Sequence, residues 1–164
     1  IALLFCYNKY LKYYLGRMIN MAWYCDSCGR EIKNASDGWV EWKTNSDHRG
    51  YGMRLVHHRN NCQYNGAEVY RQEKATLSDL DLGFFSSQNG LMDLLQMISD
   101  DQFLDKEEVL EMIKRIHING YEKVRNYLDL AISEGVFDPN TKPGYPLEYQ
   151  IKMVSDWMDK QGIQ

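Results

Sequence analysis

Two pairs of metal-binding side chains stand in the first half of the chain. Cys25 and Cys28 are separated by two residues, and Cys62 follows His57 and His58 at intervals of four and three intervening residues. Thiolates and imidazoles are ligands that zinc binds in tetrahedral sets of four. The glycine after the second cysteine lets the chain reverse without a side-chain clash. The spacing therefore predicts a zinc site built from three cysteines and one histidine.

The choice of histidine rests on spacing and on strand alternation. His58 has the tighter spacing to Cys62, whereas alternation along the preceding strand places His57 on the same face as its apolar neighbours. We predict Cys25, Cys28, His58 and Cys62 as the ligands, with His57 as the alternative. His48 is a more distant third candidate.

The number of ligands separates a structural site from a catalytic one. A catalytic zinc normally has three protein ligands and keeps one position open for water, whereas structural sites are closed by four. Three thiolates and one imidazole complete the set, which predicts a structural Zn²⁺. The alternative is that these cysteines are reduced core residues beside a buried histidine.

Hydrophobic periodicity predicts an α+β fold in which a small β module precedes helices. Aromatic and β-branched residues at 38–43 and 51–57 predict a zinc-stabilised β hairpin of the zinc-ribbon or knuckle type. Apolar residues at helical spacing predict a bundle of about four helices, at 87–100, 105–117, 121–134 and 147–161. We expect four segments: an N-terminal extension or fragment at 1–20, the zinc module at 21–65, a linker at 66–78 and an acidic helical domain at 79–164.

Charge is distributed unevenly between the two parts of the chain. Residues 1–65 contain nine Lys/Arg and five Asp/Glu, a net +4, whereas residues 66–164 contain ten and eighteen, a net −8. Such a division indicates either two functional halves or two differently solvated surfaces. The metal-like cysteine spacing favours a reducing compartment, and no apolar run approaches the ~20 residues of a membrane span. We therefore expect a cytoplasmic protein without a membrane partner.

Basic and aromatic residues alternate along the predicted hairpin. Positive side chains can bind phosphates and aromatic rings can stack on bases, which is typical of nucleic-acid binding. The alternative is that the tryptophans fill the core of a small module. The candidate nucleic-acid-binding residues are Lys43, Arg49, Arg54, Arg59, Trp39 and Trp42.

The zinc module resembles small zinc-ribbon-like proteins of bacteria and their phages, many of which have no assigned role. The segments that carry the resemblance are Trp23-Tyr24-Cys25-Asp26-Ser27-Cys28-Gly29, Gly38-Trp39-Val40-Glu41-Trp42 and Val56-His57-His58 to Cys62. It covers about a quarter of the chain and implies a metal-binding cytoplasmic protein without specifying a reaction.

A second resemblance concerns the run Leu55-Val56-His57-His58, which is similar to the strand that carries the general-base histidine in HNH nucleases. That family also implies a second cysteine pair and a downstream asparagine and histidine. Here the only later histidine is His117, and no cysteine follows Cys62. A metal-dependent nuclease using His57 is therefore kept as the alternative function.

A third possibility is a protein partner for the acidic helices. Acidic side chains that a basic partner could contact are Asp100, Asp101, Glu107, Glu108 and Glu111. Nothing in the sequence pairs a nucleophile with a base, and no glycine-rich phosphate loop has the required spacing. We therefore predict a non-enzymatic, zinc-binding interaction protein whose partner is a nucleic acid or a protein.

Overall fold

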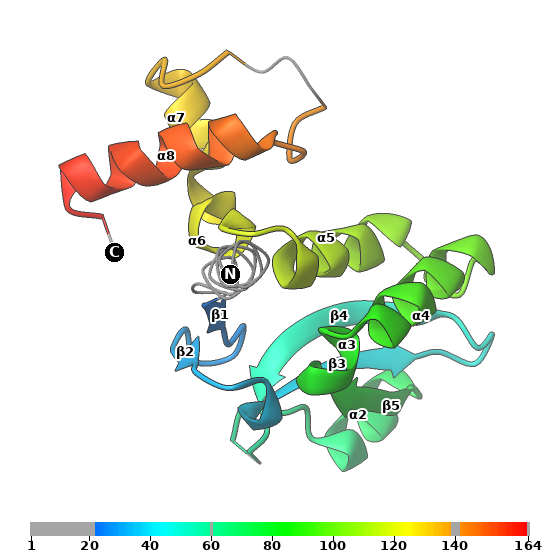
Figure 1. Cartoon of the computed structure of the whole chain (residues 1–164). Coiled ribbons are helices and arrows are strands. Elements are labelled where there is room, and N and C mark those ends of the chain that lie inside the picture. The colour runs from blue at the N-terminus through cyan, green and yellow to red at the C-terminus, as the bar shows by residue number, and fades with distance from the viewer. Residues whose placement is uncertain (1–21, 60, 139–141, 164) are drawn as a thin grey trace, which may run out of the picture.

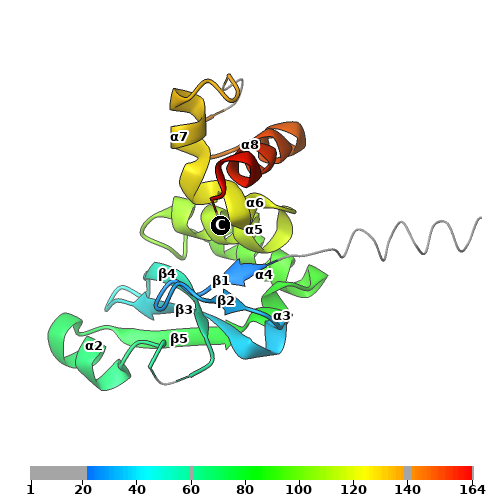
Figure 2. The same cartoon turned by 90° about the vertical axis from the view of Figure 1, so that its left-hand side faces the viewer.

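The computed structural model describes residues 22–59, 61–138 and 142–163, and the predicted extension at 1–20 lies outside these residues. The fold is α+β, as predicted, with two small antiparallel sheets and helices most of which follow the last strand in the chain (Figure 1). The turned view shows the larger sheet at one end, α7 and α8 at the other, and α5 and α6 between them (Figure 2).

The larger sheet has three strands. The predicted hairpin is confirmed as β3 (Gly38–Thr44) and β4 (Gly50–His57), which pair antiparallel with Trp39 opposite Val56. A third strand, β5 (Thr76–Asp81), pairs with the other edge of β3, so that the strand order is β4-β3-β5. The central position of β3 explains why Val40 is fully buried.

The predicted linker at 66–78 is a structured part of the fold. It contains α2 (Gly66–Glu73) and the first residues of β5. The Asn65 side chain accepts a hydrogen bond from the Glu68 amide and so caps the start of α2. Only Val69 of this helix is buried, which is why the segment lacked a clear apolar stripe in the sequence.

A two-stranded ribbon precedes the larger sheet. Its strands, β1 (Trp23–Tyr24) and β2 (Glu31–Ile32), pair antiparallel with Trp23 opposite Ile32. The short 3-10 helix η1 (Ala35–Asp37) connects β2 to β3. The turn between β1 and β2 is the one that carries the first cysteine pair.

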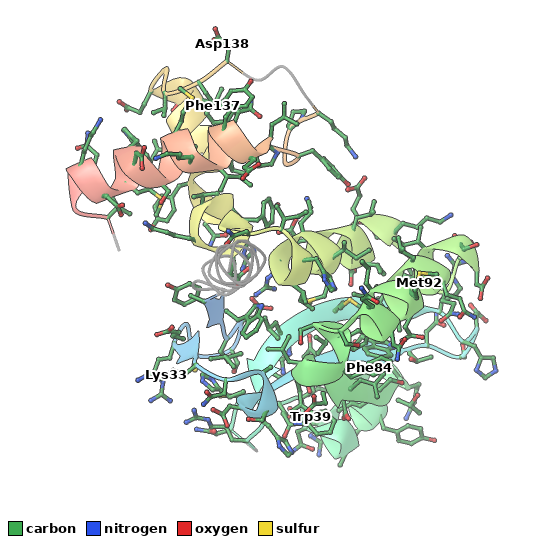
Figure 3. The ribbon with its side chains drawn as sticks, viewed as in Figure 1. Lys33, Trp39, Phe84, Met92, Phe137 and Asp138 are labelled. Atoms are coloured by element: carbon green, nitrogen blue, oxygen red, sulfur yellow. The ribbon has the colours of Figure 1, made fainter. Side chains whose placement is uncertain are left out.

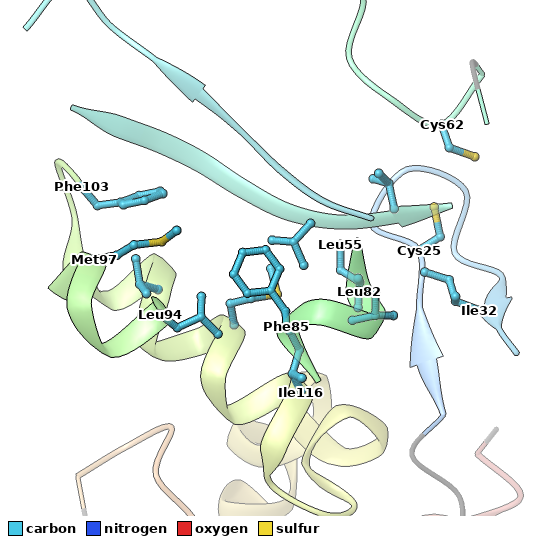
Figure 4. Packing of buried hydrophobic residues seen from close by; sticks show 14 residues of the cluster. Cys25, Ile32, Leu55, Cys62, Leu82, Phe85, Leu94, Met97, Phe103 and Ile116 are labelled. Atoms are coloured by element: carbon cyan, nitrogen blue, oxygen red, sulfur yellow. The ribbon is translucent and has the colours of Figure 1, made fainter. Parts of the chain in front are cut away.

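Three helices pack against the larger sheet: α3 (Leu82–Phe85), α4 (Gln88–Ser99) and α5 (Lys106–His117). The last two confirm the helices predicted at 87–100 and 105–117. Ser87 caps α4 by accepting from the Gly90 amide, and Asp105 caps α5 by accepting from Glu107. Their buried side chains share one core with the sheet and with the ribbon (Figure 4); its central members include Ile32, Leu55, Leu82, Phe85, Leu94, Phe103 and Ile116.

The helix predicted at 121–134 is broken into three pieces: α6 (Tyr121–Val124), the 3-10 helix η2 (Arg125–Tyr127) and α7 (Leu128–Ser133). The N-cap of α6 is Gly120 at φ 76°, so no side chain caps the first turn of this helix. The carboxylate of Glu122 instead turns inward to an arginine of α5.

The last helix, α8 (Glu148–Gln161), packs on α6 and α7 around a second core (Figure 1). That core contains Tyr121, Val124, Leu128, Ala131, Phe137, Ile151, Val154 and Met158. The division between the two cores thus falls between Ile116 and Tyr121, and the first core joins residues on both sides of 66–78. None of the described helices has the length and apolar character needed to cross a membrane.

Candidate metal centre

The turn between β1 and β2 presents two sulfur atoms on the same side. The Gly29 amide donates to the Cys25 carbonyl at 2.8 Å, and the Cys25 amide donates to the Arg30 carbonyl at 2.9 Å, which closes the turn around Cys28. Gly29 has φ +69°, in the left-handed region that favours glycine. The glycine is therefore required by the backbone angle and not by lack of space.

The other two donors come from the end of β4 and the turn that follows it. His57 is the last residue of β4, and its amide lies 3.4 Å from the Cys25 sulfur. The Cys62 amide donates to the Arg59 carbonyl at 2.9 Å, which turns Cys62 back toward the strand. Figure 4 shows the side chains of Cys25 and Cys62 near the same end of β4.

The four donor atoms of Cys25, Cys28, His57 and Cys62 all lie within 4.8 Å of one another. A tetrahedron with thiolates about 2.3 Å from zinc has edges of about 3.8 Å, so the cluster is close to the size of a zinc site. Cys25, His57 and Cys62 are buried, which excludes water from most of the cluster. The donor set therefore fits a metal ion held by four protein ligands.

The hydrogen bonds of His57 leave one particular nitrogen for a metal. Its Nδ1 lies 3.5 Å from the Cys28 sulfur, whereas its Nε2 lies 3.1 Å from the Glu31 carbonyl oxygen. A carbonyl can only accept, so Nε2 carries the proton and Nδ1 presents a lone pair to the sulfurs. Fixing the tautomer through the second nitrogen is the usual arrangement of a metal-bound histidine.

The pKa values of Cys28 and Cys62 are shifted in opposite directions. Hydrogen bonds from the backbone and then the side chain of Arg30 lower the pKa of Cys28 to about 6. Burial raises the pKa of Cys62 to about 11, and hydrogen bonds with the other two sulfurs act in the same direction. A cation at the centre would stabilise all three as thiolates, since metal binding releases the thiol protons.

The structure places His57 in the cluster and not His58, which the spacing had favoured. Side chains alternate along β4, so only one of two successive histidines can face the cysteines. The neighbouring ring of His58 is exposed and lies on Trp39, with 4.5 Å between ring centroids. Alternation along the strand, and not the spacing to Cys62, therefore determines which histidine faces the cysteines.

A buried arginine connects this cluster to the helices. The guanidinium of Arg115, in α5, donates to Asp26 at 2.7 Å, to Glu122 at 2.8 and 2.9 Å and to the Tyr24 carbonyl at 3.2 Å. Asp26 stands between the two cysteines of the turn, and its carboxylate also accepts from the Leu55 amide at 2.7 Å. The metal-binding turn is thus held to a strand and to two helices at once.

Most of the cations predicted to bind nucleic acid are paired within the chain. Lys43 forms an ion pair with Glu73 at 2.8 Å, and Arg54 with the buried Glu41 at 2.6 Å. Arg49 pairs with Asp101 at 3.2 Å and also donates to the Phe103 carbonyl. These three cations are therefore already neutralised by acidic side chains.

The two predicted tryptophans and the last predicted cation have different environments. Trp42 packs edge-on against Phe85 and lies beside Phe103 in the first core. Trp39 is half-buried and supports the exposed ring of His58. Arg59 is exposed, and among the described residues it forms no ion pair with a carboxylate.

Two further cations near the metal centre were missed by the sequence analysis. Arg30 interacts with the Cys28 sulfur, and Lys33 is exposed just beyond β2. Like Arg59, neither forms an ion pair with a carboxylate in the described part of the chain. We call Arg30, Lys33 and Arg59 the basic face. Their closeness in the sequence to the two pairs of metal-binding side chains was the signal that could have identified them.

Comparison with known proteins gave no match to any family model, curated protein or solved structure. The function of the site is therefore inferred from the geometry of its residues.

Proposed function

We propose that this protein binds one structural Zn²⁺ through Cys25, Cys28, His57 and Cys62 and acts by binding nucleic acid, without catalysing a reaction. The observation that carries the proposal is the convergence of three sulfurs and one imidazole nitrogen within 4.8 Å. Thiolate-rich sets select zinc over magnesium or calcium, which prefer oxygen ligands. Four protein ligands leave no open position for substrate or water.

The hydrogen bonds of His57 argue against the nuclease alternative. A general base needs a free ring nitrogen within reach of the proton that it removes. His57 is 5% exposed, and its two nitrogens face the Cys28 sulfur and the Glu31 carbonyl. It therefore serves as a ligand and has no nitrogen left for proton transfer.

The contacts of the acidic helices favour nucleic acid over a basic protein partner. Glu107 is paired with Lys142, Glu111 with Lys114, and Asp101 with Arg49 and Lys106. The other two candidates are also engaged: Glu108 accepts from the Met53 amide and Asp100 from two glutamines. The acidic side chains thus have partners inside the chain, whereas the cations of the basic face form no ion pair with a carboxylate among the described residues.

The first test is the metal content of the full chain purified without chelator. We expect one zinc per chain by elemental analysis, because the cluster offers one set of four donors. A chain that folds with no bound metal would overturn this part of the proposal.

The second test is binding of the zinc-loaded chain to a fluorescently labelled 20-nucleotide single strand, followed by anisotropy over a salt series. Three phosphate contacts, one for each cation of the basic face, predict a slope of about −2 in a log-log plot of affinity against salt. Absence of binding to DNA and RNA strands at low salt would overturn the nucleic-acid part.

A further inference from the structure

A polar pocket of about 360 Å³ opens directly beside the metal centre. Its walls come from β2, the segment between β2 and β3 and the end of β4, and they include the proposed ligand His57. The side chains that matter for binding are Lys33, Asn34, Ser36, Asp37, His58 and Arg59. All six are exposed, so a ligand can reach them from solvent.

Two of the pocket residues can bind a phosphate. Lys33 and Arg59 belong to the basic face and both line the pocket, one following β2 and the other following β4 in the chain. The side chain of Lys33 extends outward from the ribbon (Figure 3). Because neither is paired with a carboxylate in the described part of the chain, both can form charge-assisted hydrogen bonds with an anion.

Two carboxylates line the same pocket, which argues against an inorganic anion as its ligand. Asp37 is the better placed, because the side-chain Nδ2 of Asn34 donates to its Oδ2 at 2.8 Å and holds the carboxylate in position. Glu31 lies on the same wall. A matching ligand must therefore carry N–H donors as well as negative charge, and a nucleotide has both, on its base and its phosphate.

An aromatic platform for a base lies at the edge of the pocket. The exposed His58 ring rests on Trp39, with an interplanar angle of 48°, and Trp39 in turn packs against the first core. Unpaired bases stack on aromatic rings of this type in proteins that bind single strands. Core packing beneath Trp39 fixes the platform before the ligand arrives.

We propose, on the basis of the nucleic-acid function above, that this pocket binds one unpaired guanine nucleotide of a single strand. Guanine presents N1–H and N2–H side by side, and a carboxylate such as Asp37 can accept both. Its phosphate lies between Lys33 and Arg59, and its ring stacks on His58. The volume is at the lower end of the roughly 300–1,000 Å³ of small-molecule sites, which suits one nucleotide and excludes a duplex.

The test compares two labelled strands, an oligothymidine 9-mer and the same strand with one central guanine, by anisotropy with the zinc-loaded full chain. We expect the guanine strand to bind roughly 5- to 150-fold more tightly, the range that one bidentate base contact gives. Pairing the guanine with its complement should remove this preference, because the base edge is then occupied.

Three variants test the individual contacts. Asp37→Asn should abolish the guanine preference without weakening oligothymidine binding, because it removes one negative charge and the bidentate acceptor. Lys33→Ala and Arg59→Ala should weaken both strands about equally. The matched control is Lys152→Ala. Lys152 is 74% exposed, pairs with Asp156 on the same helix, α8, and does not line the pocket. Zinc content and circular dichroism verify that each variant is folded.

The outcomes separate this inference from the function on which it rests. If wild type binds the strands but shows no guanine preference, or if Asp37→Asn retains it, the pocket assignment is overturned and the general nucleic-acid function stands. Equal affinities for Lys33→Ala, Arg59→Ala and Lys152→Ala would overturn it as well. If wild type binds neither strand, both proposals fall.

Discussion

Arg115 and Asp26 are separated by 89 positions in the sequence, yet Arg115 Nη1 donates to Asp26 Oδ2 at 2.7 Å. The arginine is 4% exposed and belongs to α5, whereas the aspartate lies between the two cysteines of the metal-binding turn. Burial alone would lower the pKa of Arg115, but its hydrogen bonds to Glu122 and Asp26 raise it above the ordinary value. This contact makes the metal site and the helices parts of one folded unit.

The first prediction is that Arg115→Met destabilises the zinc-loaded chain by about 3–5 kcal/mol. Removing the guanidinium takes the buried cation away from Glu122, whose side chain is 4% exposed, and leaves the less buried Arg125, at 3.1 Å, as its remaining cationic partner among the described residues. The measurement is the free energy of unfolding in urea at constant zinc. Lys152→Ala, which removes an exposed pair on α8, should change it by less than about 1 kcal/mol. A similar decrease in the free energy of unfolding for both variants would show that the buried ion pair stabilises the chain no more than an exposed one.

The second prediction separates the two adjacent histidines. His57→Ala should lose most of its bound zinc, because it removes the one imidazole in the described part of the chain whose nitrogen faces the sulfurs. His58→Ala should keep one zinc per chain, because its ring is exposed on Trp39. Native mass spectrometry of both variants provides the comparison. Zinc loss in His58→Ala with retention in His57→Ala would reverse the ligand assignment.

Much of the fold could be predicted from the regular spacing of hydrophobic residues along the sequence. The hairpin β3-β4 and the helices α4, α5 and α8 lie close to their predicted bounds, because each has a long apolar stripe that packs on a core. The segments that were missed are short or exposed. Strand β5 is only half-covered, and α2 buries a single residue, so neither has a periodic signal that a sequence can carry.

The site was predictable in its residue types but not in its surroundings. Three cysteines at characteristic intervals indicated a metal site, since few other arrangements bring thiols together in a reduced protein. The choice between His57 and His58 required the register of β4. The partners of Lys43 and Arg54 required tertiary contacts with α2 and within the sheet, and a sequence does not contain these.

The third prediction is that zinc removal loosens α5 as well as the metal-binding turn. Chelation frees the turn that carries Asp26, and α5 then loses one acceptor of its buried arginine. Hydrogen exchange measured by mass spectrometry should show faster exchange over residues 106–117 in the chelated chain. As an internal control, α8 lies on the second core and should change less. Unchanged exchange in α5 would mean that the site and the helix fold independently.

The fourth prediction concerns the close contact between α3 and α4. A Cβ at Gly90 would lie 2.2 Å from the Phe84 carbonyl oxygen and 2.3 Å from the Phe85 Cα, and these backbone atoms cannot move aside cheaply. Gly90→Ala should therefore destabilise the chain by about 1–3 kcal/mol. Alanine normally gains up to about 1 kcal/mol over glycine inside a helix, which does not offset such a clash.

Asn89→Ala is the matched control for this helix, because Asn89 is exposed in the same turn of α4 and its side chain can be shortened without a clash. Its free energy of unfolding in urea should equal or slightly exceed that of wild type, since alanine favours the helix. The decisive quantity is the difference between the two variants. If Gly90→Ala proves as stable as Asn89→Ala, α3 and α4 do not pack as closely as their backbones indicate, and the covering of the sheet at Phe85 must be looser.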